Sequence, residues 1–202
     1  MAAEPQWELL AVGTHVHHVH PNRYTALAFN PHVDPKSLAR FSPIFDATGS
    51  AIPSWYGGLS ERGALYETIF RDVVGRADRT IYKEKLTPQV LSEVRLSNSV
   101  RLLKLFGTGP TTVGIHNQIT KLLPNQYGIS RDEAQRLHDL FPEAQGFIWR
   151  SRISDDELSF VVYADRVVPA FFGSLVNSVP LLSDAGLELV LEAANSLKTV
   201  IA

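Results

Sequence analysis

The sequence predicts a single domain of the α+β class. Many short strand-like runs are interspersed with only a few helical ones, which favours this class over a regular parallel α/β sheet. No internal repeat or long linker divides the 202 residues, and 45% of them are hydrophobic, enough to fill one sizeable core. We therefore expect one domain over residues 1–202.

The expected strands are short runs rich in β-branched and aromatic residues. They lie at residues 9–19, 24–29, 90–96, 100–105, 146–153, 158–164 and 166–172. Aspartates separate the last three runs, as in tight turns, so we expect an antiparallel meander there. Alternation along a strand places Phe147, Trp149 and Ser151 on one face.

Three helices are expected where apolar residues recur three and four positions apart. They cover residues 60–74, 131–140 and 184–198, and each follows a serine that can cap its first turn: Ser60, Ser130 and Ser183. Residues 106–114 are rich in glycine and threonine and predict an irregular loop able to border a cleft.

The composition excludes several classes of function. The formal net charge is -2 and no run of lysines and arginines forms a basic stripe, so we expect no direct nucleic-acid partner. The absence of cysteine removes disulfides, thiolate nucleophiles and zinc–thiolate sites. The amino terminus lacks the pattern of a secretory signal and prolines interrupt the apolar stretch 167–182, so we expect a cytoplasmic protein without a membrane partner.

Arginines, aromatic residues and one carboxylate follow one another between Arg23 and Glu67. Arginine forks bind phosphate, aromatic faces stack on a base or pyridinium ring, and a carboxylate stabilises a developing positive charge on a sugar. This combination indicates chemistry on NAD. Gly57 and Gly58 allow the backbone to approach a ligand, or form only a turn.

Glu67 is the candidate for the catalytic carboxylate. It lies off the apolar row of its predicted helix, and its neighbours one turn back, Gly63 and Ala64, leave a shallow patch beneath it. Glycine inside a helix costs about 1 kcal/mol relative to alanine, which suggests the close approach of a ligand or of another backbone. The alternative is a solvated surface carboxylate that pairs with Arg71 at the i+4 position.

The ordered series of Arg23, Arg40, Tyr56, Glu67 and Ser151 resembles the RES-domain family, which comprises toxins of bacterial toxin-antitoxin pairs. The resemblance covers about residues 20–170. It implies a fold similar to that of ADP-ribosyltransferases, in which a split antiparallel β-core and flanking helices surround an NAD cleft.

The resemblance also implies an activity. NAD would be the substrate, with cleavage of its nicotinamide–ribose bond and no metal. The acceptor stays open among phosphate, water and a protein side chain. The implied catalytic residues are Glu67, Arg40 and Ser151, and the implied NAD-binding residues are Arg23, Tyr24, Arg40, Tyr56 and Ser151. The implied partner is a cognate Xre-type antitoxin, with a helix-turn-helix type of domain, that obstructs the cleft.

Two alternatives belong to other classes of protein. In a non-catalytic module, two arginines would bind a phosphorylated ligand while Glu67 merely pairs with Arg71. In a histidine-dependent metalloenzyme, pairs from the cluster at residues 15–20, which holds four of the seven histidines, would bind zinc. No cysteine completes that ligand set, although Asp34 or Asp46 could fold back, and the family pattern assigns the cluster no role.

Overall fold

An eight-stranded, mostly antiparallel sheet organises the structure. The computed structural model describes residues 4–34, 38–73 and 77–202. In spatial order the strands are β1 (Trp7–Leu10), β6 (Val100–Lys104), β7 (Gly146–Arg150), β8 (Leu158–Tyr163), β3 (Ser54–Gly58), β2 (His15–Pro21), β5 (Gln89–Leu96) and β9 (Gly173–Pro180). Strands β6 and β7 pair in parallel, and the other neighbours pair antiparallel. A separate parallel pair consists of β4 (Thr80–Ile81) and β10 (Val200–Ile201).

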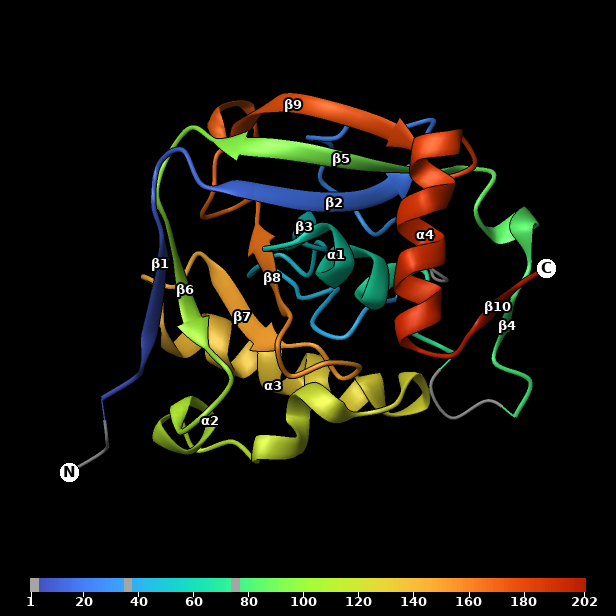
Figure 1. Ribbon diagram of the computed structural model, residues 1–202. Helices are drawn as coiled ribbons and strands as arrows, with labels where there is room; N and C mark the ends of the chain where they lie inside the picture. The colour runs from blue at the N-terminus through green and yellow to red at the C-terminus, as the bar shows by residue number, and fades with distance from the viewer. Residues whose placement is uncertain (1–3, 35–37, 74–76) are drawn as a thin grey trace.

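The sheet is split between β2 and β3. These strands share a single register pair, His17 with Gly58, whereas β2 pairs with β5 along its whole length. In Figure 1, β2, β5 and β9 cross the top of the molecule, and β6 and β7 lie below them. This arrangement confirms the predicted α+β class with a split, mostly antiparallel core and flanking helices.

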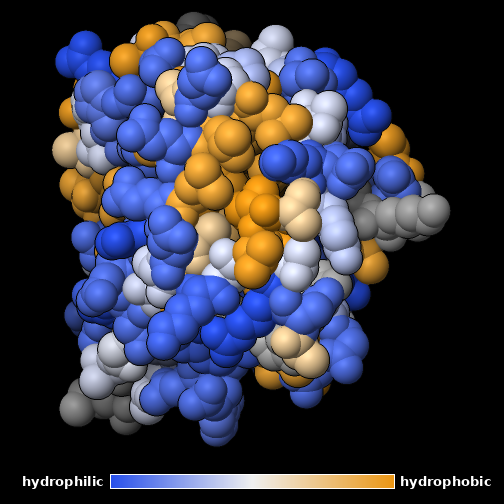
Figure 2. Space-filling model, turned by 45° about the vertical axis from the view of Figure 1, so that its right-hand side comes forward, coloured by the Kyte–Doolittle hydropathy of each residue, from blue (hydrophilic) through white to orange (hydrophobic). Residues whose placement is uncertain are grey.

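The helices pack on the sheet through two buried clusters. The described residues form α1 (Glu61–Thr68), α2 (Gly109–Thr112), α3 (Tyr127–Leu140) and α4 (Asp184–Ser196). One cluster joins α1 to α4 and includes Leu65 and Val190, and the other lies against α3 and includes Trp149. Figure 2 shows apolar side chains near the middle of one face of the molecule. On α4 itself, Leu191 is exposed. Part of the outer side of α4 is therefore apolar as well.

Residues 24–29, predicted as a strand, form turns instead. The Tyr24 N–H donates to the Pro21 carbonyl at 3.0 Å, which bends the chain directly after β2. Ala26 is buried, and its carbonyl accepts the indole N–H of Trp55 at 2.9 Å. The apolar pattern of this segment therefore reflects packing on the core and not membership of the sheet.

Two other predicted strands are misplaced. Residues 9–19 are divided between β1 and β2 by a turn at Gly13, whose φ of 85° suits glycine. Residues 166–172 contain a 3-10 turn over Pro169–Phe171, since proline cannot donate to a strand ladder. The strand begins at Gly173 and pairs with β5, so it is not the third strand of a meander with β7 and β8.

Strand β3 is absent from the sequence prediction because glycines are poor strand formers. Close packing explains both of them. A Cβ atom on Gly57 would lie 2.4 Å from the Trp55 ring, and one on Gly58 would lie 2.6 Å from the backbone nitrogen of Ala64. Gly58 therefore lets the backbone of α1 approach the sheet, and Gly57 makes room for the aromatic side chains of Trp55 and Phe160.

The helix starts are confirmed in two of three cases. The Ser60 and Ser183 side chains accept backbone N–H groups at the starts of α1 and α4. Helix α3 begins before its predicted start, and the Ser130 hydroxyl donates to the Arg40 carbonyl at 2.6 Å instead of capping the helix. Helix α1 ends at Thr68, and the rest of its predicted range forms turns up to residue 73, while residue 74 lies outside the described residues. Over the described ranges, no helix is both long and apolar enough to cross a bilayer.

His18 is partly buried at the split in the sheet. Its ring stacks on His20 with centroids 5.0 Å apart and packs against Trp55, and its Nδ1 lies 2.6 Å from the Tyr56 carbonyl oxygen. Burial, with the nearby His20, lowers the pKa of His18 to about 3, so the ring is neutral near pH 7.

The depressed pKa of His18 predicts a loss of stability in acid. The unfolded chain binds a proton at this residue below about pH 6.5, whereas the folded chain does so only near pH 3, so the free energy of unfolding falls as pH drops across that window. Chemical denaturation at pH 7.0, 6.0 and 5.0 should show a pH slope lower in His18→Asn than in wild type by up to about 1.4 kcal/mol per pH unit. An identical slope in the two proteins would contradict the assignment.

Candidate functional site

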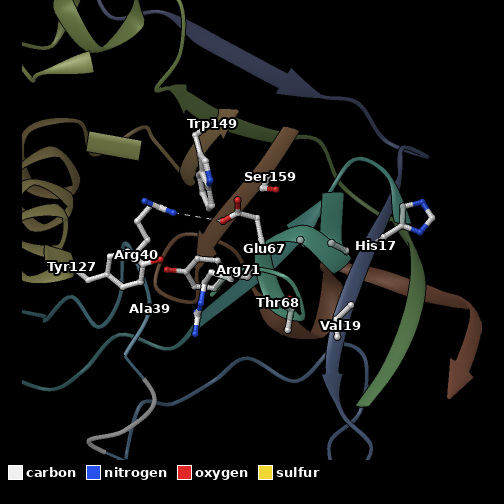
Figure 3. Close-up of a pocket in the computed structure, with 13 residues that line it drawn as sticks. His17, Val19, Ala39, Arg40, Glu67, Thr68, Arg71, Tyr127, Trp149 and Ser159 are labelled. Carbon is white, nitrogen blue, oxygen red and sulfur yellow. Dashed lines mark ion pairs between the residues drawn. The ribbon is translucent and has the colours of Figure 1, made fainter. Parts of the chain in front are cut away.

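A cavity of about 180 Å³ lies between the two buried clusters and contains Glu67 and Arg40. Trp149 borders it from the cluster at α3, and Val19 and Ala64 border it from the cluster at α1. Figure 3 shows the Arg40 guanidinium and the Glu67 carboxylate directed toward each other across it. The site therefore lies where the two halves of the fold meet, one half built on the cluster at α1 and α4 and the other on the cluster at α3.

Helix α1 places Glu67 at the cavity and is held at its first turn by Glu157. That carboxylate is 5% exposed and accepts hydrogen bonds from the Ser60 hydroxyl and, at 2.6 Å, from Arg62 Nε. A Cβ on Gly63 would lie 3.3 Å from a Glu157 carboxylate oxygen and 3.4 Å from the Leu158 carbonyl. The helix glycine is thus explained by close approach of another chain segment, one of the two explanations expected from sequence.

Ser151 fixes one oxygen of the Glu67 carboxylate. Its fully buried hydroxyl donates to Glu67 Oε1 at 2.7 Å and accepts the Ile153 N–H at 3.2 Å. The Ser151 carbonyl in turn accepts a hydrogen bond from Lys121 Nζ at 3.0 Å. Strand β7 ends one residue earlier, and Ser151 is not part of the cavity wall. The structure places its hydroxyl on the carboxylate, where it orients Glu67. The contact of Ser151 with NAD stays a prediction.

Arg40 is the buried cation of the site. Its side chain is 3% exposed, its Nη1 donates to the Leu122 carbonyl at 3.0 Å, and its Cζ lies 5.0 Å from the centre of the Tyr127 ring. Nη2 lies 4.0 Å from Glu67 Oε2, beyond hydrogen-bond distance, and the Glu67 side chain is 15% exposed. The two charges are therefore neighbours whose facing sides remain available to a ligand.

Unpaired buried polar atoms are concentrated on the cavity wall. Five wall residues carry such atoms without a hydrogen-bond partner among the described residues: His17, Arg40, Tyr127, Trp149 and Ser159. In Arg40 both Nε and Nη2 are unpaired. Since buried polar groups in proteins are almost always paired, this cluster fits a ligand that supplies the missing hydrogen bonds, chiefly through acceptor atoms.

Tyr56 contributes its ring to the wall and its hydroxyl to the fold. The hydroxyl oxygen accepts the Phe41 N–H at 3.1 Å and lies 2.9 Å from Ser42 Oγ. Burial raises the pKa of Tyr56 to about 12. The ring packs edge-on against Trp149, with centroids 6.1 Å apart, so the two aromatic side chains form one apolar corner of the cavity.

Arg23 and Tyr24 lie apart from the other predicted site residues. They line a second cavity of about 340 Å³, together with His18 and His20. Val19 and Tyr56 line both cavities, so the two hollows share a wall at the split between β2 and β3. The Arg23 guanidinium lies 5.0 Å from the centre of the Tyr24 ring, and Tyr24 is 53% exposed.

The structure adds Arg71, Tyr127 and His17 to the predicted set, because all three line the Glu67 cavity. Arg71 was visible in the sequence only as an i+4 partner of Glu67. Its Nε lies 3.3 Å from Asp72 instead, because α1 ends at Thr68 and the i+4 relation is lost. Residues 106–114 contain α2 and do not line the cavity, contrary to expectation.

The histidines of β2 alternate between the two faces, as expected, with His18 stacked on His20. His15 lies 2.6 Å from Glu93, and burial lowers the pKa of His17. Within the described parts of the chain, no group of three histidine or acidic side chains is arranged to hold a metal ion.

Comparisons with known proteins add two similarities. The model of a family described as RES domain matches residues 15–183. Among solved structures, the chain is similar to the crystal structure of the M. tuberculosis MbcT-MbcA toxin-antitoxin complex. The TM-score is 0.63 and the sequence identity 16%, over 90% of this chain and 91% of that chain. At this identity the similarity is one of fold. A search of curated proteins gave no match.

The contact between Ser151 and Glu67 predicts coupled effects on stability. Ser151→Ala should lower the free energy of unfolding by about 1.5–3 kcal/mol, because a buried hydrogen bond to a charged group is lost. In a double-mutant cycle with Glu67→Ala, measured by urea denaturation, the two losses should be less than additive by at least about 1 kcal/mol. Ser159→Ala is the matched control, because its buried hydroxyl has no partner among the described residues. Additive effects would contradict the assigned contact.

Proposed function

The chain belongs to the RES domain family, and on that premise we propose that it is an enzyme that binds NAD and cleaves its nicotinamide–ribose bond. The observation that carries this proposal is the cavity in which a fixed carboxylate, a buried arginine and unpaired donors face the same space. A dinucleotide offers what those groups lack: phosphate oxygens for the donors and a sugar that becomes positively charged during cleavage.

In the proposed reaction, Glu67 stabilises the sugar cation. Nicotinamide in NAD is a cationic leaving group, so when the bond between ribose C1 and the ring nitrogen breaks, the electron pair stays on nicotinamide and the group departs neutral. The step needs no general acid, only stabilisation of the oxocarbenium-like ribose. Ser151 fixes Glu67 Oε1 from behind, which leaves Oε2 for the ribose.

Arg40 is proposed to bind a phosphate of NAD. Its position beside Glu67 and its two unpaired nitrogens support this role, because a guanidinium binds phosphate through charge-assisted hydrogen bonds. Tyr56 and Trp149 supply an aromatic corner against which the nicotinamide ring can pack.

Arg23 and Tyr24 are proposed to bind the more distant half of NAD. Because their cavity shares a wall with the Glu67 cavity, a dinucleotide laid across the split in the sheet can use both. The acceptor that attacks ribose C1 is phosphate, water or a protein side chain. Phosphate or water would make the enzyme deplete NAD, and a side chain would make it a mono-ADP-ribosyltransferase.

As part of the same proposal, the protein is the toxin of a bacterial type II toxin-antitoxin pair and acts in the cytoplasm. Membership of the RES domain family supports this role, as does the fold shared with the MbcT-MbcA toxin-antitoxin complex. The proposed partner is a cognate antitoxin of the Xre type that covers the cavity. Binding to DNA would come through that partner.

The test is release of nicotinamide from NAD, measured by liquid chromatography. The wild type should release it, and Glu67→Gln should lower kcat by about 10²–10³-fold with little change in KM, because the carboxylate acts on charge that appears in the transition state. Glu61→Gln is the matched control, since Glu61 lies in the same helix but outside the cavity wall.

Absence of nicotinamide release by the wild type, with or without phosphate or cell extract, would contradict the enzyme and favour the binding module. Full activity of Glu67→Gln would reject the role of the carboxylate. Mass spectrometry of the products names the acceptor: ADP-ribose 1''-phosphate indicates phosphate, free ADP-ribose indicates water, and a mass-shifted protein indicates a side chain.

The second cavity predicts a different kinetic effect. Arg23→Gln should raise KM for NAD about tenfold and change kcat little, because the arginine would bind a part of NAD that is unchanged by the reaction. Arg101→Gln, an exposed arginine on β6 whose guanidinium lies over Trp7, serves as the control. A loss confined to kcat in Arg23→Gln would place that residue at the reacting bond instead.

A further inference from the structure

Tyr127 lies on the cavity wall, and its ring contacts the Arg40 guanidinium. It is the first residue of α3, is 3% exposed, and its hydroxyl has no hydrogen-bond partner among the described residues. Most buried hydroxyls are paired, because leaving one unpaired costs the free energy of its lost hydration. The unpaired hydroxyl therefore requires an explanation.

The surroundings of that hydroxyl are predominantly cationic. Burial raises the pKa of Tyr127, and the charges that act on it come from Arg40, Arg71, Glu67 and Arg152 in that order. The hydroxyl thus keeps its proton and can donate a hydrogen bond. Three guanidinium groups and one carboxylate give the surroundings of the hydroxyl a net positive charge, which favours an anionic acceptor.

The fold also fixes Tyr127 relative to Arg40. The guanidinium lies 5.0 Å from the ring centre, and Figure 3 shows the two side chains next to each other on one side of the cavity. The buried Ser130 hydroxyl lies within hydrogen-bond distance of both backbone carbonyls, at 2.6 Å from Arg40 O and 3.1 Å from Tyr127 O. Since the two residues are tied together at the backbone and stacked at the side chain, they present their donors as one unit.

We propose that the Tyr127 hydroxyl donates a hydrogen bond to a phosphate oxygen of the dinucleotide that Arg40 binds. This inference rests on the proposed function and adds a ligand-binding residue to it. Arg40 supplies charge and its Nε and Nη2 donors, and Tyr127 supplies a neutral donor from the adjacent wall. Two donors at a fixed spacing orient the phosphate, which in turn sets the ribose against Glu67.

The proposal makes Tyr127→Phe an informative substitution, because phenylalanine keeps the ring on Arg40 and removes only the hydroxyl. The probe is ADP-ribose, which retains both phosphates and lacks the nicotinamide bond, so it is not cleaved. Isothermal titration should give a Kd about tenfold higher for Tyr127→Phe than for wild type, the effect of one lost hydrogen bond to a charged group. Equal Kd values in the two proteins would overturn the assignment.

Thermal unfolding without ligand separates this role from a structural one. Tyr127→Phe should melt at or above the wild-type temperature, since it removes a buried group that has no partner in the described fold. Tyr163→Phe is the matched control: its hydroxyl donates to the Phe41 carbonyl at 2.6 Å, so its loss should lower Tm by about 2–4 °C or more. A fall in Tyr127→Phe equal to that of the control would mean that the hydroxyl serves the fold, which also overturns the assignment.

The two proposals fail separately. If the wild type binds no ADP-ribose and releases no nicotinamide from NAD, the proposed function fails and the role of Tyr127 fails with it. If the wild type does both and Tyr127→Phe binds ADP-ribose equally well, only the assignment of Tyr127 fails.

Discussion

The central constraint on this structure is that the buried Arg40 guanidinium faces the partly buried Glu67 carboxylate. Each charge is held from behind, Arg40 by the Leu122 carbonyl and Glu67 by the Ser151 hydroxyl, and the facing atoms stop 4.0 Å apart. Taking charges out of water costs several kcal/mol per ion unless their hydrogen bonds are replaced. Here the replacement is incomplete, because two Arg40 nitrogens have no hydrogen-bond partner among the described residues. A ligand that accepts hydrogen bonds from these nitrogens would account for a buried guanidinium that is only partly paired.

The rest of the fold keeps these two groups apart and in place. Glycines in β3 and α1 bring that helix onto the sheet, and Glu157 holds its first turn, so that Glu67 emerges from a fixed support. Arg40 comes from the other half of the molecule and is tied to α3 through Ser130. Because β2 and β3 separate after one register pair, the space between the halves remains open. The site therefore lies at the split in the sheet.

Sequence reasoning predicted the fold class, the helix caps at Ser60 and Ser183, and the association of Arg40, Tyr56 and Glu67. Those features depend on local patterns or on an ordered motif. It missed β3, since the adjacent glycines Gly57 and Gly58 are as typical of a turn as of a closely packed strand. It also missed Tyr127, whose place on the cavity wall depends on contacts with residues far away in the chain, such as Arg40. Ser151 was predicted to act with Glu67, and the structure brings the two side chains into contact just after β7 ends at Arg150. The sequence did not predict that this contact is a hydrogen bond to the carboxylate.

A crystal structure with an analogue of NAD that cannot be cleaved, such as one with a carbocyclic ring in place of the nicotinamide ribose, tests the central claim most directly. We expect the analogue to cross the split in the sheet, with the carbon next to nicotinamide against Glu67 and a phosphate on Arg40. An analogue bound elsewhere, or bound with its phosphates away from Arg40 and its sugar away from Glu67, would contradict that claim.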